Sequence, residues 1–147
     1  MFKEAPLRVI VRSDVHAVVL PWIALAQLHL AAGDTGQALS AANMALQIAE
    51  ERRLGLEQGM VHRVFGEINR ALGNRAEADA AFRRSLDVLD KIQSRPELAQ
   101  TLLAYGRFRQ GDNQQEDRML IQRALRLFEE MGATGWIREA RAALAAA

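Results

Sequence analysis

The chain has 147 residues, of which half are apolar and a quarter are charged, and it contains no cysteine. This composition favours one globular domain over a disordered segment, and it excludes disulfides and thiolate metal sites. Nineteen basic and eighteen acidic side chains leave a net charge of +1, which is too small to attract nucleic acid or an anionic membrane over a long range.

No apolar run is long enough to span a membrane, because the richest stretch, residues 15–32, is interrupted by His16, Pro21, Gln27 and His29. The first residues, MFKEAPLRVIVRSD, lack the long apolar core of an export signal. We therefore expect a cytoplasmic protein that binds neither membrane nor nucleic acid. Residues 1–13 are predicted to be an N-terminal arm, whose conformation the sequence leaves open.

Residues 14–147 are predicted to form a single all-α domain. Alanine is the most frequent residue and only three prolines occur, which favours helix over sheet. Apolar residues recur at the three- and four-residue spacing of one helical face. In chain order, this pattern predicts helices over residues 17–32, 35–53, 57–72, 75–92, 95–110, 114–131 and 135–146.

Capping and turn residues mark the ends of these helices. Three pairs have the spacing of an N-terminal capping box: Asp34 with Gln37, Asn74 with Glu77, and Ser94 with Glu97. Pro96 falls in a first helical turn, where its missing N–H costs nothing. Four glycines stand where a helix is expected to end with a positive φ: Gly33, Gly73, Gly111 and Gly132.

One helix-turn-helix sequence segment occurs more than once. AAGDTGQALSAANMAL (residues 31–46) aligns with ALGNRAEADAAFRRSL (residues 71–86) at a shift of forty residues. A third copy follows with one residue fewer, because RAL (residues 123–125) lies thirty-nine residues beyond RSL (residues 84–86). Repetition of this length indicates helical hairpins stacked into a solenoid.

The repeated positions resemble those of the tetratricopeptide repeat (TPR) family. The first unit carries Trp22, Leu25, Ala26, Gly33, Ala38, Ala45 and Leu46. The second carries Phe65, Gly66, Gly73, Ala78, Phe82 and Leu86, and the third Leu103, Gly106, Ala124 and Leu125. The resemblance implies a right-handed α-solenoid of about three repeats, near residues 19–54, 57–93 and 95–132, closed by a capping helix over 135–146.

A narrower resemblance concerns the C-terminal part of the chain. The stretches SRPELAQTLLAYGRFRQGD and IQRALRLFEEMGATGWIREARAAL look like the closing segment of helical arrays in large bacterial signalling and transcriptional regulators. Such proteins couple the array to ATPase, nucleotide-cyclase, kinase or DNA-binding domains. This resemblance implies that the chain is related to, or part of, a longer regulator, whose neighbouring domain is then a candidate partner.

In TPR proteins the first helix of each hairpin lines a concave groove that binds a protein segment. The positions that correspond here include Gln27, Arg63, Glu67, Arg70, Gln100, Arg107 and Gln110. Arginine favours carboxylates, because its planar fork donates two parallel hydrogen bonds. The expected ligand is therefore a peptide with an apolar patch and an acidic residue. The alternative is that Arg63, Glu67 and Arg70 merely pair with one another along their own helix.

The sequence offers little support for catalysis or for a cofactor. It has no phosphate-binding glycine loop, and its three histidines, at positions 16, 29 and 62, have no metal-binding spacing. Ser85 with His62 and a carboxylate is a conceivable triad, but Ser85 falls in a small packing position of a helix. We expect a protein that is not an enzyme and that binds no metal.

The leading functional hypothesis is therefore a non-catalytic protein-interaction module. The alternative is a regulatory sensor that binds a small effector in an inter-helix pocket, for instance one lined by Trp22, His29 and His62. DNA binding through a helix-turn-helix is disfavoured, because acidic residues flank the arginines. A homodimer through the N-terminal end is a further expectation, since nothing polar covers the apolar face of the first helix.

Overall fold

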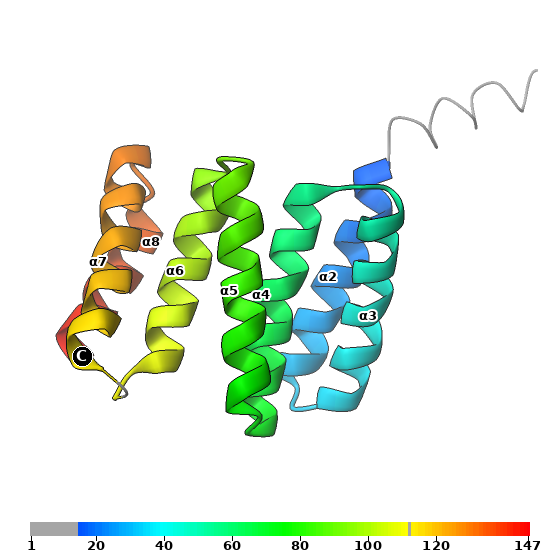
Figure 1. Cartoon of the computed structure of the whole chain (residues 1–147), viewed down its shortest axis with the longest axis horizontal. Coiled ribbons are helices and arrows are strands. Elements are labelled where there is room, and N and C mark those ends of the chain that lie inside the picture. Colours follow the sequence, from blue (N-terminus) through cyan, green and yellow to red (C-terminus); the bar gives the residue numbers. More distant parts are fainter. Residues whose placement is uncertain (1–14, 112) are drawn as a thin grey trace, which may run out of the picture.

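The computed structural model describes residues 15–111 and 113–147, so the predicted arm over residues 1–13 lies outside it. The described residues form helices and no strand (Figure 1). The helices are α2 (Val15–Ala31), α3 (Thr35–Glu51), α4 (Gly55–Leu72), α5 (Arg75–Lys91), α6 (Arg95–Arg109), α7 (Gln114–Met131) and α8 (Thr134–Ala146). Every boundary lies within two residues of its prediction.

The helices stack as consecutive hairpins. Each helix packs on the next one in sequence, and α4 also packs on α2 and α6. Figure 1 shows the resulting row, with α2 and α3 at one end and α7 and α8 at the other. The predicted all-α helical repeat arrangement is therefore confirmed.

Glycine ends four of these helices, as predicted. Gly33, Gly73, Gly111 and Gly132 have φ values of 81°, 80°, 100° and 67°. These left-handed conformations suit glycine, because it has no Cβ to clash with the carbonyl that follows.

The predicted capping boxes were only partly right. Asp34 accepts a hydrogen bond from the backbone N–H of Gln37 at 3.1 Å. Asn74 and Ser94 make no such bond, so these two predictions were wrong. The Asn74 amide instead donates to the Asn69 side chain at 3.5 Å, and Glu97 turns towards another helix. Asn113, which the sequence analysis missed, does cap α7, because it accepts from the N–H of Glu116 at 3.3 Å.

The core runs along the whole array. One apolar cluster joins α2, α3 and α4, a second joins α5 to α6, and a third joins α5, α6, α7 and α8. Small residues lie where the helices approach closely, and Ala26, Ala38, Ala45 and Ala78 are all fully buried. Their size lets neighbouring helices of the array approach each other. The alternate helices α2, α4 and α6 also pack side by side.

Candidate functional site

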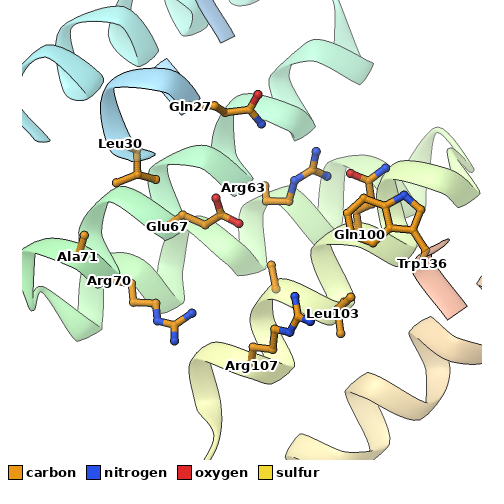
Figure 2. A pocket seen from close by; sticks show the side chains of 11 residues that line it. Gln27, Leu30, Arg63, Glu67, Arg70, Ala71, Gln100, Leu103, Arg107 and Trp136 are labelled. Atoms are coloured by element: carbon orange, nitrogen blue, oxygen red, sulfur yellow. The ribbon is translucent and has the colours of Figure 1, made fainter. Parts of the chain in front are cut away.

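A hollow lies on the surface shared by the alternate helices α2, α4, α6 and α8. Its volume is about 520 Å³. Figure 2 shows side chains from these helices around it. The lining residues are Gln27, Leu30, Arg63, Glu67, Arg70, Ala71, Gln100, Leu103, Ala104, Arg107 and Trp136. We call this hollow the groove. The first helix of every hairpin and the terminal helix contribute to it, because hairpin stacking brings equivalent faces into one row.

Six of the seven residues predicted for the site line this groove: Gln27, Arg63, Glu67, Arg70, Gln100 and Arg107. Gln110 does not. Its side-chain amide donates to the Ala143 carbonyl at 3.4 Å, and it lies beside a separate hollow at the start of α7. Gln110 is the last residue before the α6–α7 turn, so its side chain joins α6 to α8 instead of facing the groove.

Arg63 holds two helices together. Its Nη2 donates to Glu97 Oε2 at 2.7 Å, and its Nη1 donates to the Glu97 carbonyl and to Thr101 Oγ1, both at 3.2 Å. Only 7% of Arg63 is exposed. The intrahelical pairing with Glu67 that its spacing allows is therefore replaced by a bridge from α4 to α6. A guanidinium with this many internal bonds has little capacity left for a partner.

Glu67 is a carboxylate in the middle of three arginines. Burial raises the pKa of the Glu67 carboxyl above its usual value, while the nearby positive charges of Arg63, Arg70 and Arg107 lower it. Desolvation is the larger effect, because burial penalises the charged form. The groove thus holds its arginines around a partly shielded acidic group, which reduces their mutual repulsion.

Two arginines at the mouth of the groove are more accessible. Arg70 is exposed and forms no ion pair within 4 Å among the described residues. Arg107 donates from Nη2 to Glu139 Oε2 on α8 at 2.7 Å, and 36% of its side chain is exposed. Exposed ion pairs of this kind contribute only about 0–1 kcal/mol. A carboxylate from another molecule can therefore replace Glu139 at little cost.

Trp136 forms the α8 wall of the groove and was missed by the sequence analysis. Its ring stacks on Phe128 with centroids 5.4 Å apart, yet 40% of the residue is exposed. Trp136 is the third residue of α8, as Glu57 is of α4 and Glu97 of α6. Of these equivalent positions, Glu97 bonds to Arg63 on the preceding first helix, but neither glutamate lines the groove, so the repeat gave no direct signal for Trp136.

The other chemical candidates from the sequence do not meet in one place. His62 lines a separate cavity of about 340 Å³ between α4 and α5, and neither Trp22 nor His29 belongs to its lining. Burial and the nearby Arg84 lower the pKa of His62. Ser85 is fully buried, and its hydroxyl donates to the Gly59 carbonyl at 2.7 Å. It therefore serves helix packing.

Comparisons with known proteins add no identity to this geometry. No protein-family model matches the chain, and no curated protein matches it either. Within the described part of the chain, no helix is both long and apolar enough to cross a membrane. The functional argument therefore depends on the groove itself.

Proposed function

We propose that this protein is a non-catalytic protein-interaction module, and that its groove binds a peptide segment carrying an acidic residue and an apolar side chain. One observation carries the proposal: four helices from successive hairpins direct arginines and apolar side chains into a single open hollow. A hollow of this shape suits an extended or helical segment, whose side chains meet successive helices in turn. The resemblance to TPR proteins supports the same function.

The chemistry of the groove defines the ligand further. Arg70 and Arg107 would bind the acidic residue, because arginine pairs with carboxylates through two parallel hydrogen bonds. Leu103, Ala104 and the exposed part of Trp136 would contact the apolar side chain. Arg63 is left out of this assignment, because its hydrogen bonds are used within the protein. The partner would be a separate protein or a neighbouring domain of a longer regulator.

The test begins with a selection of random displayed peptides on the immobilised protein, followed by affinity measurement of the enriched peptides by fluorescence polarisation. Enriched sequences should combine Asp or Glu with an apolar residue. Their affinity should fall about tenfold or more in the Arg70→Gln/Arg107→Gln variant, because a hydrogen bond to a charged group contributes about 1.5–3 kcal/mol.

The Arg126→Gln/Arg138→Gln variant is the matched control, since it removes the same two charges from exposed positions outside the groove. Equal affinity in both variants would contradict the proposal.

The alternative function, sensing of a small effector, is tested by thermal-shift measurements against metabolites, because a ligand raises stability in proportion to ln(1 + [L]/Kd). The separation of Trp22 and His29 from the His62 cavity gives that alternative no specific support.

A further inference from the structure

The outward face of α2 is apolar and exposed. Val18, Leu20, Leu25 and Leu28 have exposed fractions of 52%, 44%, 38% and 68%. The helix contains no Asp, Glu, Lys or Arg, so its outer side is nearly as apolar as its inner side. An exposed apolar surface of this extent is uncommon on a protein that does not use it for binding.

The equivalent positions in the second repeat unit indicate that the outward face of α2 is a packing surface. A shift of forty residues maps Pro21, Ala24 and Leu28 onto Val61, Val64 and Ile68 of α4. Those three residues are at most 1% exposed, because they pack into the cluster formed with α2 and α3. The outward face of α2 is therefore equivalent to a surface that is buried one unit further along. It continues an interface that the fold already uses.

The two ends of the array differ in polarity. At the other end, Arg138 and Arg141 on α8 are exposed, and Arg141 pairs with Glu129 of α7 at 3.6 Å. Head-to-tail stacking of α2 on α8 of another copy would remove these charges from water, which is costly. The apolar face of α2 needs a partner surface that is itself free of charge.

The sequence of α2 makes this face complementary to itself. Leu20 and Leu28 stand four residues either side of Ala24, so they are symmetric about it. In two antiparallel copies related by a two-fold axis through Ala24, Leu20 of each copy would therefore lie opposite Leu28 of the other. The small side chain of Ala24 allows the helix axes to approach to about 8 Å.

We propose that two copies of this chain associate through antiparallel α2 helices, with Ala24 on the two-fold axis and Leu20 of each copy packed against Leu28 of the other. The interface is isologous, so each copy contributes the same residues and no free apolar face remains to start a fibre. Because α2 carries no charge, its self-association brings no like charges together. The contact residues Leu20, Ala24 and Leu28 are not among those that line the groove, to which α2 contributes Gln27 and Leu30.

Sedimentation equilibrium of the full chain over a concentration series measures the association. The wild type should form a dimer, and Leu28→Glu should be monomeric at the same concentrations, since the substitution places a carboxylate in the apolar contact. Met119→Glu is the matched control, because Met119 on α7 is 60% exposed and lies away from α2. Circular dichroism confirms that all three proteins are folded.

The absence of cysteine permits a test of the register. Ala24→Cys should form a covalent dimer under mild oxidation, because two residues on the axis can meet the roughly 4.4–6.8 Å Cα separation of a disulfide. Met119→Cys should remain largely uncrosslinked. A wild type that is monomeric throughout, as it would be if another segment covered α2, overturns the proposal. A dimer that survives Leu28→Glu, or one that Ala24→Cys does not crosslink, overturns it as well.

Discussion

Single glycines determine how closely the two helices of a hairpin can pack. A Cβ on Gly66 would lie 2.7 Å from the Phe82 ring, and one on Gly106 would lie 2.6 Å from Ile121 Cγ1. Both distances are too short for carbon atoms. Gly66 and Gly106 are forty residues apart, and the equivalent position in the first unit holds the fully buried Ala26. Small size at this position is therefore a property of the repeat itself.

Replacement of Gly66 tests this packing. Gly66→Ala should lower the free energy of unfolding by about 1–3 kcal/mol, because an extra methyl group in a filled core forces its neighbours out of position. Gly135→Ala is the control, since a Cβ at this position of α8 would have no atom within 4 Å and alanine favours helix. Urea denaturation followed by circular dichroism measures both. If Gly66→Ala were as stable as the wild type, α4 and α5 could separate enough to accommodate the methyl group without any loss in the free energy of unfolding.

The ends of the helices show how far local sequence predicts structure. Glycine positions were correct, because a left-handed residue is a local requirement that one residue type meets best. The capping box at Ser94 failed, because Glu97 forms its bond with Arg63, thirty-four residues away. The box at Asn74 failed as well, and the Asn74 amide donates to Asn69 instead. Arg53 and Gln93 end α3 and α5 with φ values of 55° and 56°, which their residue types did not predict.

Gln93 should therefore carry a conformational penalty at the end of α5. A left-handed backbone costs a residue with a side chain about 1–2 kcal/mol. Replacement by glycine removes this cost, but glycine also has more conformational freedom in the unfolded chain, which offsets part of the gain in stability. Gln93→Gly should raise the free energy of unfolding by about 0.5–1 kcal/mol. Gln122→Gly, in an exposed part of α7, should instead lower it by about 1 kcal/mol. Thermal unfolding compares the two, and a loss of stability in both would refute the strain at Gln93.

The candidate site likewise combines features that the repeat spacing predicts with features that depend on contacts between distant residues. Repeat spacing placed Gln27, Arg63, Glu67, Arg70, Gln100 and Arg107 around one groove, because equivalent residues of stacked hairpins fall in a row. It could not indicate which arginine is accessible. The ion pairs of Arg63 and Arg107 join residues thirty-four and thirty-two positions apart, and such pairs depend on how the units stack. Asp117 is another example: it occupies the position of Ala38 and Ala78, and is buried in an ion pair with Arg109.

At the scale of the whole molecule, stability depends on contacts between neighbouring units. Helices pack on those nearby in sequence, and the apolar clusters link one unit to the next. Arrays of this kind behave as a chain of coupled units, so a weakened junction can separate the unfolding of the two ends. Phe82 is the central residue of one junction. Its ring lies 5.6 Å from that of Tyr105 and 5.4 Å from that of Phe108 on α6.

Phe82→Ala should therefore uncouple the two ends of the array as well as destabilise it. The buried cavity should cost about 3–5 kcal/mol, and the contact between the second and third units should be largely lost. The chain has two tryptophans, Trp22 on α2 and Trp136 on α8, so each reports on one end. Urea titrations of Trp22→Phe and Trp136→Phe proteins should give coincident fluorescence transitions while Phe82 is present, and separate transitions once it is replaced by alanine. Coincident transitions in the alanine background would mean that the remaining contacts between α4, α5 and α6 hold the array together as one cooperative unit.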